Sequence, residues 1–268
     1  MPFTKTQAIL KRMLPARTFE WLYQIATAGY NLGQQVADYI YYTLPRRDKD
    51  KKFMMLTIKS VLSHTMVGRG GLIATYRACK DIEERKVGGC LVECGVARGG
   101  CSALMLMASF YEGGLGGRVA WLFDSFEGLP EPTTQDGALR KPQGKDRSSW
   151  DLAKGYCLGT QEEVEDLLFS QFGFDKSKIH LVKGWFQDTL PRYREQIGDI
   201  AVLRIDGDWY ESTRRCLENL YDNVVKGGYI IIDDYALVGC QKAVDEFFTG
   251  EDYPEVILDG RGGGWFRK

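Results

Sequence analysis

Apolar runs of two to six residues recur along the chain from residue 90 onward, and amphipathic segments separate them. Seven of these runs are predicted to be strands: 90–94, 119–123, 179–182, 200–205, 229–232, 256–258 and 265–266. Apolar residues at helical spacing predict helices over 101–111, 212–224 and 244–248. The glycines of Lys226-Gly227-Gly228 are expected to end the second helix. Because strands and helices alternate, the sequence predicts an α/β fold with a doubly wound, mostly parallel sheet.

The first 60 residues follow a different pattern. They carry ten basic and four acidic residues, a net charge of +6, so the remaining 208 residues carry −7. Two apolar stripes at helical spacing predict one helix or two over 18–43, and the charged run to Lys52 is expected to end this helical part. Such stripes favour burial against protein, so residues 1–60 are predicted to be a helical arm or lid, or the contact of a homo-oligomer. Contact with a membrane surface is the alternative.

A polar insertion interrupts the α/β pattern at 128–160. It contains Pro130, Pro132 and Pro142 and is too long for a simple connection. Segments of this kind often cover binding sites, so we expect a lid within an α/β domain that spans 61–268.

Composition narrows the class of protein. The 268 residues are 44% hydrophobic and 26% charged, with a net charge of −1, which excludes a disordered chain and argues against a nucleic-acid partner. No apolar run reaches the roughly 18 residues of a membrane-spanning helix, and the N-terminal residues lack the apolar core of a secretory signal. The seven cysteines match no zinc or C-x-x-C spacing, which indicates a reducing compartment, and we expect a cytoplasmic protein.

Carboxylates gather at the ends of the predicted strands. Glu93, Asp124, Asp206 and Asp233 lie at or just after a strand end, whereas the strand bodies carry almost no acidic residues. In an open α/β sheet, ligands bind beyond the carboxyl ends of the strands. A cation or several ligand hydroxyls would relieve the repulsion among these side chains. The sequence therefore predicts a binding site at this edge.

The loop after the first predicted strand is rich in glycine. Its pattern is Gly95-x-x-x-Gly99-Gly100 rather than the G-x-G-x-x-G of a dinucleotide site, yet it still allows a ligand to lie against backbone at a helix N-terminus. Asp124 follows Gly95 by 29 residues. It could hold ribose hydroxyls or, alternatively, cap the next segment, and Glu93 has a similar alternative as a carboxylate that ties the loop.

Asp206, Asp233 and Asp234 end two strands that we expect to be neighbours, so their side chains can converge. Three close carboxylates would repel strongly unless they bind a hard cation such as Mg²⁺, or unless one takes a raised pKa that suits a general base. A polar strand end with a helix cap is the alternative. Asp208 is expected to cap the helix that starts near Ser212.

Large aromatic residues follow strands at the same edge. A purine could stack on Trp185, Phe186 or Trp209, or these side chains could simply pack under a loop. The two histidines, His64 and His180, are not candidates for a catalytic triad or a zinc site, and no cysteine has a nearby histidine for nucleophilic catalysis.

Five segments together resemble the macrocin O-methyltransferase family, whose members act on sugar or aromatic hydroxyls in antibiotic biosynthesis. The matching runs are 91–100, 124–130, 183–191, 204–213 and 227–235, and 65–68 is similar to the family segment that closes over the cofactor. The resemblance covers about 65–268. It implies a seven-stranded Rossmann-like methyltransferase sheet with an N-terminal helical extension, S-adenosylmethionine as methyl donor and Mg²⁺ as cofactor. The implied acceptor is a hydroxyl of a small molecule, a glycosylated or phenolic natural product.

The resemblance also implies roles for individual residues. The implied cofactor-binding positions are Thr65, Met66, Glu93, Gly95, Ser102, Asp124, Ser125, Gly184, Trp185, Phe186 and Asp206. Among them, Glu93 and Gly95 would lie beside the methionine part of the donor. Asp124 would bind the ribose hydroxyls, and Trp185 would lie near adenine. The implied metal ligands are Asp206, Asp233 and Asp234, and Asp206 is also the implied general base.

Some positions depart from the family, and two other classes of protein compete. Cys94, Ala97 and Cys101 replace residues that are frequent in the family and would tune the pocket. The N-terminal arm and the insertion do not follow the family closely, so the acceptor stays open. A metal-dependent glycosyltransferase or phosphatase would use the Asp206-x-Asp208 pair, but no P-loop lysine follows the glycine-rich loop. A non-catalytic S-adenosylmethionine-binding protein would not need the three carboxylates.

Overall fold

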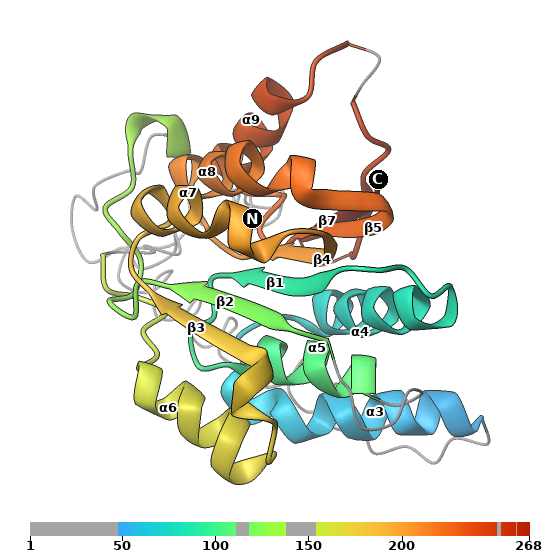
Figure 1. The fold of residues 1–268 in the computed structure, drawn as a ribbon. Coiled ribbons are helices and arrows are strands. Elements are labelled where there is room, and N and C mark those ends of the chain that lie inside the picture. Colours follow the sequence, from blue (N-terminus) through green and yellow to red (C-terminus); the bar gives the residue numbers. More distant parts are fainter. Residues whose placement is uncertain (1–47, 111–117, 138–153, 251–252, 261) are drawn as a thin grey trace, which may run out of the picture. The chain divides into compact units, whose positions relative to one another are not determined.

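The computed structural model describes residues 48–110, 118–137, 154–250, 253–260 and 262–268. The predicted helical segment 18–43 and most of the predicted arm lie outside the described residues. In the described part, one sheet has the strand order β3-β2-β1-β4-β5-β7-β6 (Figure 1). Its strands are β1 (Cys90–Cys94), β2 (Ala120–Asp124), β3 (Ile179–Lys183), β4 (Ile200–Ile205), β5 (Val224–Ile232), β6 (Ile257–Leu258) and β7 (Gly264–Arg267).

The sheet is mostly parallel, which confirms the prediction. Strands β1 to β5 pair in parallel, and β7 runs antiparallel to its neighbours β5 and β6. The chain first builds outward from β1 to β3 and then adds β4 on the other side of β1, so the strand order reverses there. Cys94 of β1 lies opposite both Phe123 and Ile205. The loops after β1, β2 and β4 therefore start at the same level, at the kind of reversal where α/β proteins bind ligands.

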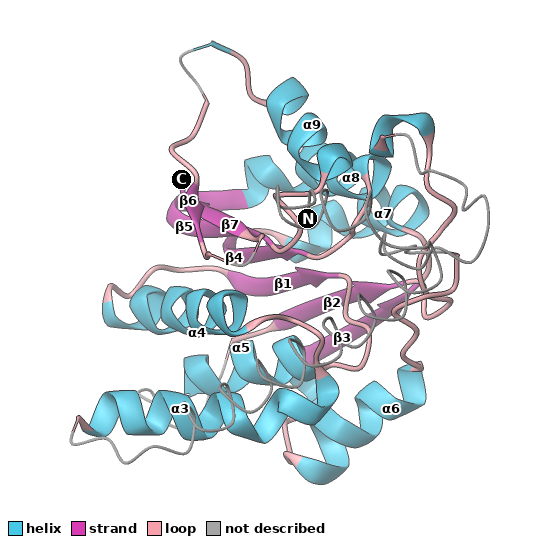
Figure 2. Cartoon of the chain, turned by 180° about the vertical axis from the view of Figure 1, so that it is seen from behind, coloured by secondary structure: helices cyan, strands magenta, loops and turns pink. Residues whose placement is uncertain are grey.

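Helices cover both faces of the sheet (Figures 1 and 2). One face carries α3 (Lys49–Val61), α4 (Arg69–Glu84) and α5 (Gly100–Phe110), and the other carries α7 (Phe186–Ile197), α8 (Tyr210–Leu220) and α9 (Val238–Phe247). A short helix, α6 (Gln161–Glu165), follows the insertion. On the second face, Leu203 and Ile230 of the sheet pack with Leu190, Leu217 and Val244 of the helices. Removal of this apolar surface from water stabilises the layers.

Strand β5 differs from its prediction. Helix α8 ends at Leu220, a 3-10 turn covers 221–223, and β5 already contains Gly227 and Gly228. The prediction that these glycines end the helix is therefore wrong. A Cβ on Gly228 would lie 2.9 Å from the Ala201 carbonyl oxygen, so glycine allows β5 to approach β4 closely. The Gly227 N–H donates to the Lys268 carbonyl at 2.5 Å, which ties β5 to the chain end.

Helix α3 opens the described chain. The Asp48 side chain accepts hydrogen bonds from the backbone of Asp50 and Lys51, so a helix begins within the charged run. Helix α3 packs against α5 and α4, and residues 49–60 therefore belong to the same compact unit as the sheet. In the part of the chain that the structure describes, no helix is both long and apolar enough to cross a bilayer.

Candidate active site

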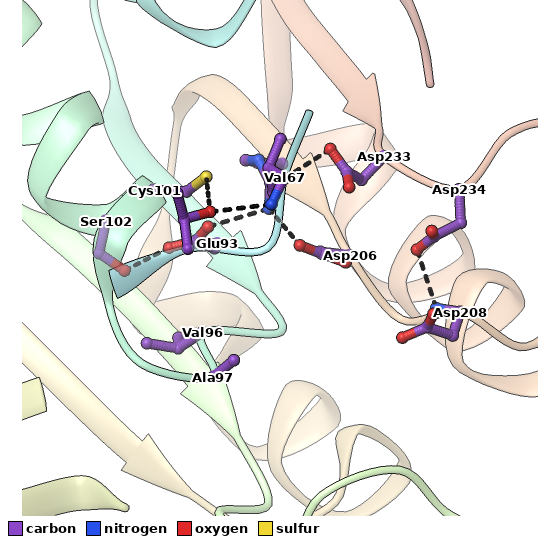
Figure 3. A network of polar contacts seen from close by, with 12 residues as sticks. Val67, Glu93, Val96, Ala97, Cys101, Ser102, Asp206, Asp208, Asp233 and Asp234 are labelled. Carbon is purple, nitrogen blue, oxygen red and sulfur yellow. Dashed lines mark hydrogen bonds and ion pairs between the residues drawn. The ribbon is translucent and has the colours of Figure 1, made fainter. Parts of the chain in front are cut away.

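A buried arginine lies at the centre of the acidic edge. Arg204 of β4 is fully buried, and its Nη1 donates to Glu93 Oε1 at 3.0 Å and to Asp206 Oδ2 at 2.8 Å. Its Nη2 donates to Asp233 Oδ1 at 2.7 Å. Figure 3 shows Glu93, Asp206 and Asp233 pointing toward one centre. These three carboxylates therefore share one internal cation, which reduces their mutual repulsion.

Glu93 is enclosed on the side of the glycine-rich loop. The side chain is fully buried in β1, and Oε2 accepts a hydrogen bond from the Ser102 hydroxyl in the first turn of α5. Burial raises the pKa of Glu93 to about 7, although Arg204 and Ser102 oppose the shift. The structure thus brings together two residues that the sequence assigned to the donor.

Asp124 organises the glycine-rich loop. Its Oδ2 accepts the backbone N–H groups of Val96 and Ala97 at 2.7 and 2.8 Å, and its Oδ1 accepts that of Phe126 at 2.7 Å. The side chain therefore caps no helix but joins the loop after β1 to the turn after β2. In that turn, the Ser125 hydroxyl accepts from the Glu127 backbone and donates to the Gly128 carbonyl at 3.3 Å.

Two glycines are required where the first loop meets its neighbours. Gly95 has φ +96°, and a Cβ there would lie 1.7 Å from the Asp206 carbonyl oxygen. A Cβ on Gly100 would lie 2.6 Å from the His64 carbonyl oxygen. The predicted closing segment therefore lies directly beside the loop. In it, the Thr65 hydroxyl accepts from the Val67 backbone, and Met66 is 65% exposed.

The loop after β3 adjoins the same place. The Gly184 N–H donates to the Asp124 carbonyl at 2.9 Å. Trp185 lies just before α7, where its carbonyl accepts from the backbone of Thr189. Phe186 packs against the apolar core. Of the two neighbouring aromatic residues, Phe186 thus takes the packing role, and Trp185 is left as the candidate for a bound purine.

An acidic cluster forms beside the buried arginine. Carboxylate oxygens of Asp206, Asp208 and Asp234 all lie within 4.8 Å of one another, and the Asp208 N–H donates to Asp234 Oδ2 at 3.2 Å (Figure 3). Burial, together with Asp206 and Asp233, raises the pKa of Asp208 to about 7. Burial also raises the pKa of Asp234. Asp208, expected to cap a helix, is thus part of the cluster, whereas Asp233 pairs with Arg204.

The turn that carries Asp208 is strained. Asp208 has φ +56°, a left-handed conformation that is uncommon outside glycine, and the Trp209 N–H donates to the Gly207 carbonyl at 2.5 Å. Strained backbone of this kind persists only where surrounding contacts hold it. Trp209 itself is buried, and its indole N–H donates to the Pro130 carbonyl at 3.1 Å. Trp209 therefore packs under the insertion, which is one of the two roles that its sequence position left open.

The acidic cluster fits a hard divalent cation. Three carboxylates that lie within reach of one another are the oxygen donors that Mg²⁺ prefers. Without a cation, burial and mutual repulsion hold protons on such a group, as the raised pKa values of Asp208 and Asp234 express. Of the other residues that the sequence singled out, His180 stacks on Trp121 with a centroid distance of 4.1 Å, and all seven cysteines are free.

Comparisons with known proteins identify the family of this chain. The family model described as Macrocin-O-methyltransferase (TylF) matches residues 36–268. The 8-demethyl-8-(2,3-dimethoxy-alpha-L-rhamnosyl)-tetracenomycin-C 4'-O-methyltransferase of Streptomyces olivaceus is 36% identical over 206 residues, 76% of each chain. Demethyldecarbamoylnovobiocin O-methyltransferase of Streptomyces niveus is 36% identical over 208 residues, again 76% of each. The solved structure of the O-methyltransferase NovP has 35% identity and a TM-score of 0.62, covering 76% of this chain and 82% of that one.

These matches decide between the classes of protein that the sequence left open. They favour neither a glycosyltransferase nor a phosphatase, and they confirm the resemblance drawn from five separate motifs. The chain belongs to the macrocin O-methyltransferase (TylF) family and is an O-methyltransferase.

Proposed function

We propose that this enzyme transfers a methyl group from S-adenosylmethionine to a hydroxyl of a glycosylated or phenolic natural product, with Mg²⁺ in the acidic cluster. The observation that carries the proposal is that Glu93 and Asp206 accept from the same nitrogen of Arg204. A donor site around Glu93 and a cation site around Asp206 would therefore adjoin. Their closeness suits a reaction whose rate depends on how an acceptor oxygen and a methyl group are positioned.

On the donor side, each residue has a role that its contacts support. The buried carboxylate of Glu93 would bind the ammonium group of the methionine part, with Ser102 holding its second oxygen. Asp124 holds the glycine-rich loop through two backbone N–H groups, and its remaining lone pairs would accept from the ribose hydroxyls. Gly95 lets the backbone approach the donor closely, and Trp185 would stack on adenine.

On the acceptor side, we propose that Asp206 and Asp234 hold the cation, while Asp208, the third carboxylate of the cluster, lies beside it and stays free to take a proton. Asp233, which the sequence also assigned to the metal, pairs with Arg204 through Oδ1, as Asp206 does through Oδ2, and its place among the ligands stays a proposal. When bound, Mg²⁺ supplies a positive charge that lowers the pKa of an acceptor hydroxyl.

The general base that the sequence predicts is Asp206. Its Oδ2 is paired with Arg204 at 2.8 Å, and an ion-paired carboxylate is a weaker base. Among the described residues, no donor bonds the Asp208 carboxylate, so we propose Asp208 for this role. The hydroxyl proton passes to Asp208, the oxygen electron pair forms the new bond to the methyl carbon, and the methyl–sulfur bond breaks with its electron pair going to sulfur.

The acceptor class rests on the relatives. One of them acts on a rhamnosyl tetracenomycin and the other on demethyldecarbamoylnovobiocin, by their names. A natural product that carries a sugar is therefore the first acceptor to test. The predicted arm over 1–60, its role in a homo-oligomer, the lid over 128–160 and a cytoplasmic location stay proposals. Light scattering on the full chain tests the oligomer.

Two measurements test the proposed function. S-adenosylhomocysteine should raise the melting temperature of the wild type, and Mn²⁺ should bind as a substitute for Mg²⁺. Asp208→Asn should bind S-adenosylhomocysteine within about twofold of the wild type and transfer no labelled methyl to a panel of glycosylated acceptors. Asp206→Asn should lose Mn²⁺ affinity. Full turnover by Asp208→Asn would remove the proposed base, and a melting temperature that responds only to nucleotide sugars would overturn the methyl donor.

A further inference from the structure

The strained turn that carries Asp208 is held from two sides. On the inner side, the Asp208 N–H donates to Asp234, and the Cys240 thiol donates to the Asp208 carbonyl at 3.3 Å. On the outer side, the contacts come from Pro130 and Asp136 of the insertion, which accept hydrogen bonds from Trp209 and Tyr210 directly after the turn. Because a left-handed conformation at an aspartate persists only where neighbours hold it, the outer contacts have a part in placing this carboxylate.

Asp136 of the insertion caps helix α8 from a distance. The residue in the N-cap position of α8 is Trp209, which makes no side-chain capping bond. Instead, Asp136 Oδ1 accepts the N–H of Tyr210, the first helical residue, at 2.6 Å. The carboxylate thus supplies the acceptor that the N-cap residue lacks, and adds its negative charge to that of Glu211 in the first turn. Helix α8 begins two residues after Asp208, so this bond fixes the far end of the strained turn.

Asp136 is itself fixed in position. Its Oδ2 accepts from the backbone N–H and the hydroxyl of Thr133, at 2.7 and 2.9 Å, which leaves Oδ1 free for α8. Helix α9 leaves room for it at Gly239, where a Cβ would lie 2.1 Å from Asp136 Oδ1. Lys242 on the same helix donates to Gln135. Three separate features therefore place this one carboxylate at α8.

We propose that Asp136 is a positioning residue: it holds the turn of Asp206 and Asp208 in place and thereby sets the affinity of the acidic cluster for a divalent cation. The claim that Asp136 affects cation affinity rests on the proposed function, which places the cation in this cluster. The two ends of the linkage are physical contacts, the Tyr210 N–H at one end and the Asp208 N–H on Asp234 at the other. Linkage is reciprocal, so a cation in the cluster also stabilises the docked insertion.

The first test is a titration with Mn²⁺ of the full-length wild type, Asp136→Asn, Asp136→Ala and Gly239→Ala. We expect Asp136→Ala and Gly239→Ala to bind Mn²⁺ about two- to tenfold more weakly, the fold-change of one hydrogen bond, with the affinity for S-adenosylhomocysteine unchanged. Asp136→Asn loses the same charge as the alanine variant but keeps an acceptor for Tyr210. A smaller loss in Asp136→Asn therefore separates the hydrogen bond from long-range charge.

The second test is hydrogen exchange in the same four proteins, with and without Mn²⁺. The Tyr210 amide and the peptide over 206–213 should exchange faster in Asp136→Ala and Gly239→Ala, and Mn²⁺ should slow exchange over 128–137 in the wild type. Asp175→Ala is the matched control. Like Asp136, Asp175 accepts a backbone N–H, in this case that of Ser177, but it lies in a turn outside the site. Gly239→Ala keeps the test decisive if Asp136→Ala does not fold.

Unchanged exchange at Tyr210 in both variants would overturn the proposal, and so would faster exchange with unchanged Mn²⁺ affinity. A wild type that binds no Mn²⁺ would overturn the cation assignment of the proposed function instead. In that case, the exchange of Tyr210 alone decides whether Asp136 holds the turn.

Discussion

Arg204 and Glu93 form an ion pair at 3.0 Å with both side chains out of contact with solvent. The same Arg204 nitrogen also reaches Asp206, so one guanidinium neutralises a carboxylate of the proposed donor site and one of the proposed cation site. A guanidinium suits this task because its donors form a rigid planar fork and it stays charged when buried. The active site is therefore built on an internal cation that no substrate has to supply.

Replacement of this arginine should be costly. Arg204→Met leaves Glu93, Asp206 and Asp233 without their counter-ion, and the loss of one partner from a buried ion pair destabilises a protein by about 3–5 kcal/mol. We expect a fall of that order in the free energy of unfolding, measured with urea at pH 7. Arg215 on α8 is the control, because it pairs with Glu211 and Glu218 at the surface and Arg215→Met should cost less than about 1 kcal/mol. Equal stabilities of the two variants would contradict a structural role for the buried cation.

Glu93→Gln should separate donor binding from cation binding. The amide has nearly the shape of the carboxylate but lacks the charge that would attract the ammonium group of the donor. We expect calorimetry to show S-adenosylhomocysteine binding at least about tenfold weaker, a loss of roughly 1.4 kcal/mol, with Mn²⁺ affinity little changed. Glu83→Gln is the matched control, since Glu83 pairs with Arg118. If Glu93→Gln binds S-adenosylhomocysteine like the wild type, the assignment of Glu93 to the donor fails.

The fold and the position of the site could be predicted because both depend on local patterns. The apolar runs coincide with the seven observed strands to within a residue or two, except at the start of β5. Carboxyl ends of parallel strands meet at one edge whatever the loops do, so Glu93, Asp124 and Asp206 could be assigned to one site before their contacts were known. Asp124 bonds to the loop after β1, and Glu93 and Asp206 both bond to Arg204 of β4.

The contacts that could not be predicted join residues far apart in the chain. The one signal for Arg204 was a charged residue inside the apolar run 200–205, which does not say which carboxylates it meets. Asp208 was assigned to a helix cap because it precedes a helix, but Asp136, 72 residues earlier, supplies that cap. Gly227 and Gly228 resemble a helix end in sequence, yet both lie in β5, where Gly228 allows the close approach to β4. Spacing alone cannot distinguish these alternatives.

Gly95→Ala should disable the site by a steric clash. The added Cβ would lie 1.7 Å from the Asp206 carbonyl oxygen, which is backbone and cannot turn away, so the loops after β1 and β4 have to separate. We expect the binding of both S-adenosylhomocysteine and Mn²⁺ to be lost, together with a fall in melting temperature. Gly173→Ala is the control, because Gly173 has φ +70° with no atom within 4 Å of its Cβ position. It isolates the backbone strain, about 1 kcal/mol. A Gly95→Ala protein that behaves like Gly173→Ala would show that the loops can move apart at little cost.

The raised pKa values in the acidic cluster predict how pH affects stability. Burial, Asp206 and Asp233 raise the pKa of Asp208 from 3.8 to about 7. Between these two values the unfolded chain releases this proton while the folded chain keeps it, so the metal-free protein loses stability as pH rises through this window, and the loss is complete above the folded pKa.

Asp208→Asn removes the carboxyl group that titrates. The difference in free energy of unfolding between this variant and the wild type therefore isolates the effect of Asp208. The free energy of unfolding of the variant relative to the metal-free wild type should rise between pH 5 and pH 8, by about 2 kcal/mol. Mn²⁺ should act in the opposite sense on the wild type, because the cation binds the ionised carboxylates: its affinity and the melting temperature it adds should both grow from pH 5 to pH 8. In calorimetry of the wild type, the binding of Mn²⁺ should release protons near pH 6 and fewer protons at pH 8. If Mn²⁺ affinity does not depend on pH in this range, Asp208 carries no proton that the cation displaces, and the cluster is not the place where it binds.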